Sequence, residues 1–307
     1  QAGSLRLSRG TEIVAAAQAR QEVLVWTDSS LYSLQYVGAG SGVWAAQLVG
    51  EQISIASQNS VAYASGVSYW MGKDKFYKYD GSTQPLQCDL RKYVFTDFNT
   101  EQYNQVFGGS NEAFNEVWWF YCSSSATDND RYVVYNYLEH IWYYGSMARS
   151  AWLDSGLRAF PLAATFNSVL VNHEEGVDDN ETGTTAAISA FITSADFDLE
   201  DGDKFMLMSR VLPDVSFEGS TAANPAITMS FFPLTSSGSG YNSPTSESGV
   251  STGVATRSAT SPVEVYTSQI HTRVRGRQVS MKIESSAAGV QWQSGATRID
   301  IRPDGRR

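Results

Sequence analysis

The sequence contains few of the residues that usually carry metal, redox or covalent chemistry. Its two cysteines, Cys88 and Cys122, are too few for a disulfide framework and lack the CxxC spacing of a zinc site. Each lies beside strand-like residues. We interpret both as reduced, half-buried thiols, which indicates folding in a reducing cytoplasm. Of the three histidines, His140 lies between two expected strands and is typical of a turn or core position.

Signatures of common enzymes are also missing. The sequence has no Gly-x-Ser-x-Gly elbow, no phosphate-binding GK[ST] loop and no S-x-D-x-G-x-x-W marker of propeller sialidases. We therefore expect no catalytic residue, no cofactor and no resident metal. A glycosidase stays open as an alternative, because it needs only two carboxylates about 5–10 Å apart across a cleft.

Long apolar runs are absent as well. No window of about eighteen residues is apolar throughout, so the sequence predicts no membrane span. The chain opens with QAGSLRLSRG, which lacks an initial methionine and is not a charged-then-apolar signal peptide. We expect this start to be processed or truncated and part of the fold to lie upstream.

Charged residues are sparse, at 18%, and unevenly placed within a net charge of −10. Residues 171–220 hold twelve acids and two bases, whereas residues 265–307 hold eight bases and three acids. Such a chain does not attract nucleic acid by its bulk charge. This uneven distribution of charge along the chain favours a protein whose two ends bind different partners, or whose acidic and basic ends contact each other in neighbouring copies. Charge scattered over solvated loops is the alternative.

Aromatic and β-branched residues are plentiful, and they favour strands. Groups of short strands begin near residues 23, 67, 117 and 162. A step of roughly 45 residues matches one four-stranded propeller blade. The expected strands are 22–28, 30–38, 67–72, 75–81, 116–122, 131–137, 140–145, 162–166 and 169–176, with 11–22 as a further strand in preference to a helix. Helix is otherwise nearly absent. We predict an all-β protein with propeller-like blades over residues 1–183, and we expect the blades to be incomplete at the N-terminus.

One hairpin, NEVWWFYCSSSATDNDRYVVYNYLEHIWYYG at 115–145, is crowded with large rings and shows no strict apolar–polar alternation. A blade sandwiched between two others loses that alternation because both of its faces are covered. We therefore interpret these rings as core between blades. Exposed rings that form a platform for a sugar or a base are the alternative.

After residue 183 the strands become longer and alternate cleanly. Val274, Val279, Met281 and Ile283 stand among basic and polar neighbours, as antiparallel strands with one buried face require. Residues 184–307 are therefore predicted to form a β-sandwich. Ser, Thr and Gly make up two thirds of residues 235–261, which we expect to be a projecting loop that orders against a neighbour. A surface loop without such a role is the alternative.

Two acidic clusters stand out on either side of the predicted boundary at 183/184. The first includes Glu174, Glu175, Asp178 and Asp179, and the second includes Asp196, Asp198, Asp201 and Asp203. The second is similar to a calcium loop, but its glycine falls one position late for the D-x-D-x-D-G pattern. A divalent cation at either cluster and a plain acidic turn at a strand end both stay open.

Several segments resemble, in order, the tail nozzle proteins of short-tailed bacteriophages, also called phage DNA-stabilisation or tail-tube proteins. The segments are VLVWTDSSLYSLQYVG, VSYWMGKDKFYKYDG, NEVWWFYC…DRYVVYNYLEHIWYYGSMARSAWLD, LVNHEEGVDD and VRGRQVSMKIES…WQSGATRIDIRPDGRR. The similarity covers nearly the whole chain. Its most specific parts are the middle block and the C-terminal RGRQ…RIDIRPDGRR, whereas residues 235–261 match least. Members of this family are usually longer at the N-terminus.

The resemblance implies a structural protein of the virion tail, made in the host cytoplasm. A homo-hexameric ring would lie below the portal and adaptor, continue the DNA channel, retain the genome and conduct it at ejection. Tail fibres or tailspikes would attach around the ring, and DNA would pass without sequence-specific binding. The family brings no catalytic residues.

Within such a ring, we expect the acidic loops to line the lumen or to contact a basic edge of the next subunit. The candidates are Glu174, Glu175, Asp178, Asp179, Asp196, Asp198, Asp201 and Asp203. The basic counterparts are Arg273, Arg275, Arg277, Arg298 and Arg302. Reversing the charges of Asp178 and Asp179 is expected to slow ejection or block assembly. The competing hypotheses are a carbohydrate-binding or glycan-hydrolysing propeller tail protein and a scaffold propeller unrelated to phage.

Overall fold

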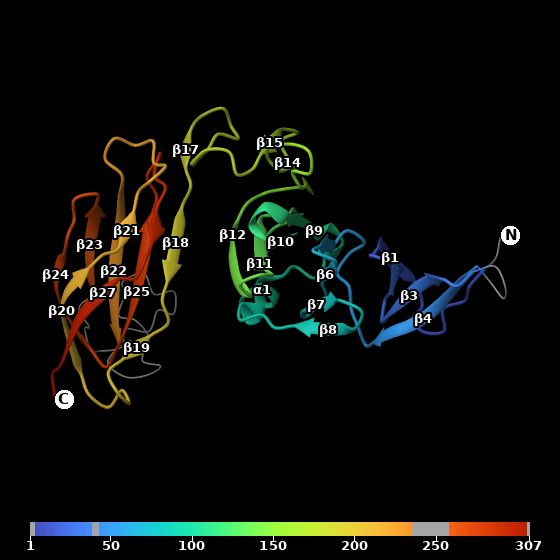
Figure 1. Cartoon of the computed structure of the whole chain (residues 1–307), viewed down its shortest axis with the longest axis horizontal. Coiled ribbons are helices and arrows are strands. Elements are labelled where there is room, and N and C mark those ends of the chain that lie inside the picture. Colours follow the sequence, from blue (N-terminus) through green and yellow to red (C-terminus); the bar gives the residue numbers. More distant parts are fainter. Residues whose placement is uncertain (1–3, 39–42, 235–257, 306–307) are drawn as a thin grey trace. The chain divides into compact units, whose positions relative to one another are not determined.

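The computed structural model describes residues 4–38, 43–234 and 258–305. The chain forms two compact units, a first unit of Gln1–Glu175 and a second unit of Gly176–Arg307. Both consist almost entirely of antiparallel strands (Figure 1), so the predicted all-β class is confirmed. The second unit thus begins before the predicted boundary at 183/184, and within it Asp178 accepts a hydrogen bond from the backbone of Gly289 (2.7 Å).

The first unit contains three four-stranded sheets and one three-stranded sheet, each built from consecutive strands. The first three sheets are β1 (Ile13–Gln18), β2 (Val23–Thr27), β3 (Ser30–Tyr36) and β4 (Trp44–Glu51); β5 (Val61–Ala64), β6 (Val67–Met71), β7 (Phe76–Tyr79) and β8 (Thr83–Leu86); β9 (Phe107–Asn111), β10 (Glu116–Tyr121), β11 (Arg131–Asn136) and β12 (Ile141–Ser146). The fourth is β13 (Ala151–Leu153), β14 (Leu162–Ala164) and β15 (Leu170–Asn172). This up-and-down order is the topology of a propeller blade. The step of about 45 residues is the interval between the second strands of successive sheets.

The sheets of the first unit pack face to face in chain order. Trp26 of the first sheet meets Trp70 of the second edge-on, with ring centroids 5.2 Å apart. Phe76, on the other face of the second sheet, packs on Trp119 of the third at 5.0 Å. On the far face of the third sheet, Trp118 stacks on Trp152 of the fourth at 5.2 Å. Both faces of the second and third sheets are therefore covered.

This packing explains the ring-rich hairpin. Every residue of β10 is buried, and successive residues serve opposite interfaces. Trp119 and Tyr121 belong to the core shared with the second sheet, whereas Trp118 and Phe120 belong to the core that Trp152 joins. The prediction that these rings fill the space between sheets is confirmed. The alternative of an exposed ring platform is wrong for this strand.

Two glycines in β9 make room for these indoles. Gly108 pairs with Trp119 and Gly109 pairs with Trp118 across the β9–β10 ladder. A Cβ atom on Gly109 would lie 2.3 Å from Cδ1 of Trp152. The indole is held in this place by a hydrogen bond from its Nε1 to the Ser110 carbonyl (2.8 Å). The absence of a side chain at Gly109 therefore permits the close approach of the fourth sheet.

The variant Gly109→Ala is expected to lower the free energy of unfolding of the first unit by about 1–3 kcal/mol, because the added methyl group overpacks the Trp152 indole. Urea unfolding, followed by hydrogen exchange of peptides from β9–β13, measures this loss. The same change in a Trp152→Leu background should cost less, since the obstructing ring is gone. Strictly additive effects in this double-mutant cycle would contradict the steric explanation.

The helices of the first unit are short, and the sequence did not predict them. The α-helix α1 (Arg91–Asp97) follows the second sheet, and its Val94 is buried in the core between the second and third sheets. Two single-turn helices, η1 (Tyr103–Gln105) and η2 (Glu112–Phe114), flank β9. No helix in the described part of the chain is long and apolar enough to cross a membrane.

The second unit is a sandwich of two main sheets around one core. The larger sheet contains β18 (Ala190–Thr193), β25 (Gln278–Ser285), β22 (Ala226–Leu234) and β23 (Ala259–Glu264), with β19 (Phe197–Asp198) also paired to β25; the smaller contains β24 (Ile270–Gly276), β20 (Met206–Leu212) and β27 (Arg298–Pro303). Short pairs are β16 (Asp178–Asp179) with β17 (Ala186–Ala187), and β21 (Val215–Ser216) with β26 (Gln293–Ser294). Met208 and Val274 of the smaller sheet share a core with Phe231, Val279 and Ile283 of the larger one.

The structure confirms most of the core residues predicted for this unit but not the bounds predicted for its loop. Val274, Val279 and Ile283 are buried as predicted, whereas Met281 is half-buried at the edge of that core. The predicted loop at 235–261 extends too far, because Ala259–Ser261 belong to β23 and pair with Phe231–Met229 of β22. Residues 235–257 lie outside the described residues.

Candidate functional site

The acidic cluster at 174–181 is divided between the two units. Glu175 accepts a hydrogen bond from Asn172 (2.6 Å) at the end of the first unit. Asp178 accepts one from Gly289, and Asp179 accepts one from the backbone of Glu181 (2.9 Å) in the second unit. Each of these carboxylates therefore satisfies polar groups within its own unit. Because Asp178 holds the Gly289 backbone, reversing its charge would disturb the fold, and Asp179 is the better position for a charge-reversal experiment.

The second acidic cluster covers β19 and the turn that leads from β19 to β20. Asp198 accepts a hydrogen bond from Gln278 (3.1 Å), and Lys204 pairs with Glu200 (2.5 Å). The backbone amide of Asp203 donates to Asp201 (3.4 Å) and lowers the pKa of the Asp201 carboxyl. Among the described residues, no three Asp, Glu, His or Cys side chains are arranged to hold a metal ion. The geometry is that of an acidic turn at a strand end.

A buried carboxyl group at the start of β10 was not among the residues that the sequence pointed to. Glu116 is 8% exposed. Its Oε2 accepts a hydrogen bond from Trp118 Nε1 (2.9 Å), and its Oε1 accepts one from the hydroxyl of Tyr143. Burial raises the pKa of Glu116, although these hydrogen bonds act in the opposite direction. A charged residue opening a strand that is otherwise apolar was the signal available in the sequence.

Asn111 connects Glu116 to Glu174, the one residue of the predicted acidic clusters that joins this network. Asn111 is fully buried, and its Nδ2 donates to Oε1 of Glu174 (3.2 Å). Residue Glu174 is largely exposed, but its carboxyl group is turned inward. Desolvation and then the charge of Glu116 raise the pKa of Glu174. The two acids therefore form an interacting carboxyl pair, and protonation of one relieves the repulsion between them.

One oxygen of the network lacks a partner. Asn111 Oδ1 is buried and has no hydrogen-bond partner among the described residues. The Asn111 amide reaches Glu174 through its nitrogen, so its oxygen is a buried acceptor without a donor in this part of the chain.

This carboxyl pair is poorly placed for hydrolysis of a glycan. Catalytic carboxylates flank an open cleft that admits the scissile bond. Here Glu116 lies against Trp118, whose ring is covered by Trp152 and Tyr132 at 5.2 and 4.9 Å. Glu116, the buried member of the pair, is therefore covered by the packing between the third and fourth sheets.

The cysteines and histidines are dispersed. Cys88 and Cys122 are free, and desolvation raises the pKa of the two thiols to about 12 and about 11, which keeps them protonated. His140 lies at the turn after β11, where its Nδ1 is 2.7 Å from the hydroxyl of Tyr135. His173 accepts a hydrogen bond from the buried Arg149 (3.0 Å). The turn position predicted for His140 is confirmed.

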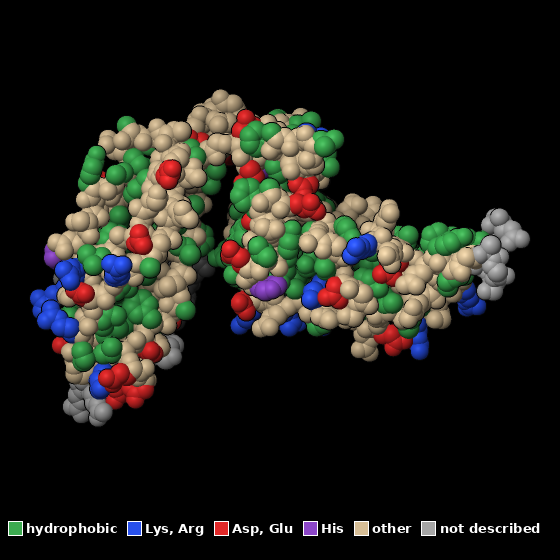
Figure 2. Space-filling view, in the orientation of Figure 1, with side chains coloured by type: hydrophobic (Ala, Val, Ile, Leu, Met, Phe, Trp, Pro, Cys, Tyr) green, Lys and Arg blue, Asp and Glu red, His purple; other side chains and the backbone are tan. Residues whose placement is uncertain are grey.

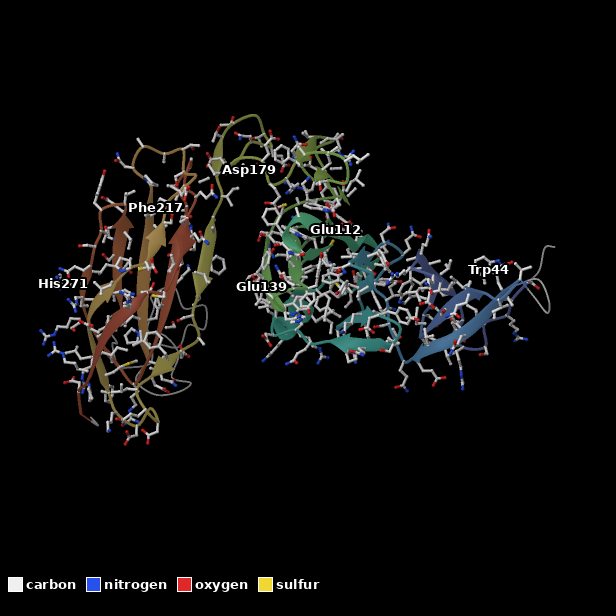
Figure 3. All side chains as sticks on the ribbon, viewed as in Figure 1. Trp44, Glu112, Glu139, Asp179, Phe217 and His271 are labelled. Atoms are coloured by element: carbon white, nitrogen blue, oxygen red, sulfur yellow. The ribbon has the colours of Figure 1, made fainter. Side chains whose placement is uncertain are left out.

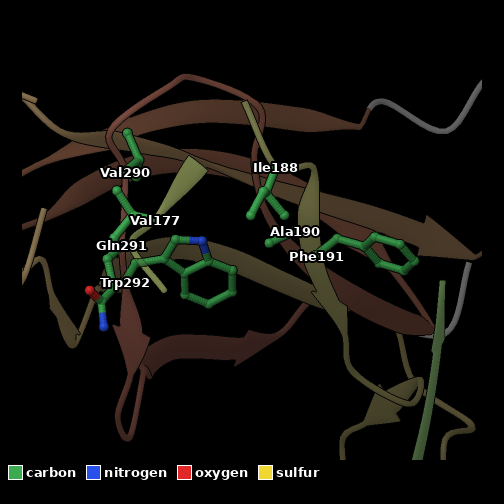
Figure 4. Close-up of a pocket in the computed structure, with 8 residues that line it drawn as sticks. Val177, Ile188, Ala190, Phe191, Val290, Gln291 and Trp292 are labelled. Atoms are coloured by element: carbon green, nitrogen blue, oxygen red, sulfur yellow. The ribbon is translucent and has the colours of Figure 1, made fainter. Parts of the chain in front are cut away.

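A surface depression in the second unit (Figure 4) has an apolar lining. Ile188, Ala190 and Phe191 form one side, and Val290, Gln291 and Trp292 form the other. These lining residues include no acid, base or nucleophile. The depression therefore offers apolar contact and one amide, without groups for acid–base catalysis.

The basic candidates gather on the smaller sheet of the second unit. Arg273 and Arg275 lie on β24, and Arg298 and Arg302 lie on β27, all at exposed positions. Figure 2 shows Lys and Arg side chains gathered on the side of this unit where Figure 3 labels His271. Arg277 lies beyond the end of β24, where its guanidinium is 5.3 Å from the Phe205 ring. Four of the five predicted arginines therefore share one sheet.

No protein-family model matches this sequence, and no curated protein is significantly similar to it. The residues and their geometry are therefore the basis for assigning a function.

Proposed function

We propose that the chain is a structural protein of a bacteriophage tail that forms a hexameric nozzle ring continuing the DNA channel below the portal and adaptor. The observation that carries this proposal is the use of the aromatic side chains. The rings of β10 pack between successive sheets, and this arrangement suits a stiff conduit rather than a reactive pocket. The resemblance of the middle and C-terminal segments to tail nozzle proteins supports the same function.

In this proposal the ring retains the genome and conducts it at ejection. Tail fibres or tailspikes attach around it, and the protein resides in the virion tail. Exposed carboxylates of the turn at Asp196–Asp203 either repel DNA phosphates in the channel or meet a basic edge of the next subunit. DNA then passes without sequence-specific binding, and no catalysis is required of the chain.

A glycan-binding or glycan-hydrolysing tail protein is the second candidate. The carboxyl pair of Glu116 and Glu174 beside Trp118 is the observation that favours it. The burial of Glu116 argues against it, since a substrate would have to part the third and fourth sheets to reach the carboxyl group.

The oligomeric state of the purified full-length chain separates these functions. The expected result is a hexamer by light scattering and a ring with a central hole by negative-stain electron microscopy. A monomer that binds or shortens host polysaccharide would favour the second candidate. A monomer that does neither would also contradict the nozzle proposal.

A further inference from the structure

We propose that the outer face of the smaller sheet in the second unit docks the acidic turn Asp196–Asp203 of a second copy of this chain. This inference rests on the proposed ring and identifies the surfaces that join its subunits. The outward side of β24, β20 and β27 is called the arginine face, and it carries Arg210, Arg273, Arg275, Arg298 and Arg302.

Strand register places these arginines on one face. Val274 of β24 points into the sandwich core, so its neighbours Arg273 and Arg275 point outward. Ile299 and Ile301 of β27 pack against the same core, so Arg298 and Arg302 also point outward. Leu207 of the central strand β20 pairs with Arg275 on one side and Arg302 on the other, which places two arginines beside one leucine.

Carboxylates within the unit neutralise only part of this charge. Arg210 pairs with Asp300 (2.7 Å), and Arg275 pairs with Asp304 (2.5 Å). Arg273, Arg298 and Arg302 form no ion pair with any described residue. Five arginines and two aspartates leave an excess of three positive charges on a chain whose net charge is −10. The arginine face is thus opposite in sign to the bulk of the molecule that would approach it.

The composition of the arginine face favours a protein partner over a nucleic acid. Half-buried Leu207 and Leu212 lie among the arginines, and arginine is the charged residue that is enriched in protein interfaces. Asp300 lies within the face and Asp304 at its end, where both would repel phosphates. The net charge of the chain also opposes the approach of a polyanion.

The acidic turn has the complementary chemistry. It presents Asp196, Asp198, Glu200, Asp201 and Asp203, and all except the half-buried Asp203 are exposed. Lys204 offsets one of these charges through its pair with Glu200. The acidic turn precedes β20 and shares no residue with the arginine face, so a contact between the turn of one copy and the face of another is heterologous. Contacts of this kind generate a ring when the rotation closes.

The variant R273E/R302E is expected to convert the hexamer into monomers, as measured by light scattering and electron microscopy of the full-length chain. Neither arginine has an ion pair to lose among the described residues, so the circular dichroism spectrum should match that of the unchanged protein. The matched control is K92E/R158E, which reverses two exposed positive charges in the first unit and should leave the hexamer intact. Raising the salt concentration should also dissociate the unchanged hexamer, since exposed charges are screened.

Rescue identifies the occupant of the arginine face. D196R/D201R alone should also give monomers, and the four changes combined in one chain should restore hexamers, because each reversed face then meets a reversed turn. Rings that persist in R273E/R302E would overturn this inference and leave the nozzle proposal standing. Monomers without rescue, or DNA binding in a mobility-shift assay that R273E/R302E abolishes, would also overturn it. An unchanged chain that forms no ring would instead contradict the nozzle proposal itself.

Discussion

Replacing Trp119 with alanine is expected to lower the free energy of unfolding of the first unit by about 3–5 kcal/mol, as for other large rings removed from a core. Trp119 has no exposed surface. Its ring packs on Phe76 at 5.0 Å and on Trp142 at 6.0 Å, and its Nε1 donates to the Ser60 carbonyl (2.9 Å). The substitution therefore creates a cavity between the second and third sheets. It also removes the shorter of two hydrogen bonds to the Ser60 carbonyl, which keeps the bond from the Met71 backbone amide (3.4 Å).

Hydrogen exchange in increasing urea measures this loss separately in each unit. Peptides from β5–β12 should lose protection at lower urea, whereas peptides from the sandwich should not change. The control Trp44→Ala removes an indole that is 46% exposed (Figure 3) and should cost far less. Equal effects of the two substitutions would refute the assignment of Trp119 as the packing centre of that interface.

Replacing Glu116 with leucine is expected to destabilise the first unit by about 1–3 kcal/mol for each donor that loses its acceptor. Trp118 Nε1 and the Tyr143 hydroxyl both donate to this carboxyl group inside the protein. Leucine fills much of the same volume but offers no oxygen to either donor. Glutamine keeps one acceptor oxygen and should cost less, as urea unfolding at pH 5 would measure.

The same pair of acids predicts a pH dependence of the first unit. The pKa values of Glu116 and Glu174 are raised above the unfolded value of 4.5, so the folded state binds more protons than the unfolded state. The stabilising contribution is therefore complete below pH 4.5 and is lost as the pH rises through the raised pKa values. Urea unfolding from pH 4 to pH 8 should show this decline in the unchanged protein.

Matched glutamine variants test the origin of that decline. Glu116→Gln removes one of the two titrating groups and should flatten the pH profile. Glu139→Gln changes an exposed acid in the same unit (Figure 3) and should leave the profile unchanged. A steep profile that survives Glu116→Gln would show that other groups are responsible.

The strands of the first unit were predictable because their signals are local. The run VWWFY at 117–121 lacks alternation, and the structure shows the reason, since its odd and even residues serve two different cores. The period of about 45 residues marked the repeating sheets even though only some of the strands in each had been recognised. The first and last strands of a sheet, such as β4 and β13, have weaker patterns because their faces are only partly covered.

Features that depend on distant residues were not predictable. Helix α1 has aromatic and β-branched residues that favour strand, and its N-cap residue Leu90 has no capping side chain. In the helical conformation Val94 is buried in the core between the second and third sheets, a contact that depends on residues distant in sequence. Likewise, Glu116 and Glu174 are far apart in sequence and meet only through Asn111, so no spacing rule connects them.

The arginine face lies between these cases. The alternation in HTRVRG and RIDIRP predicts that Arg273, Arg275, Arg298 and Arg302 each point outward. Pairing of β24 and β27 with the same strand, β20, is what brings the two rows together. In sequence, β24 and β27 are separated by β25 and β26, which belong to other sheets. The alternation within each strand therefore carries no information about this pairing.

The chain-ordered packing of the first unit has a consequence for its synthesis. Each sheet consists of consecutive strands and packs mainly against the sheet that precedes it. Its stabilising interactions are therefore with neighbouring sheets, as in a solenoid. A nascent chain can therefore complete one sheet after every 45 or so residues and dock it on the finished part before the next emerges. Such stepwise growth limits how long the tryptophan-rich surfaces stay uncovered on the ribosome.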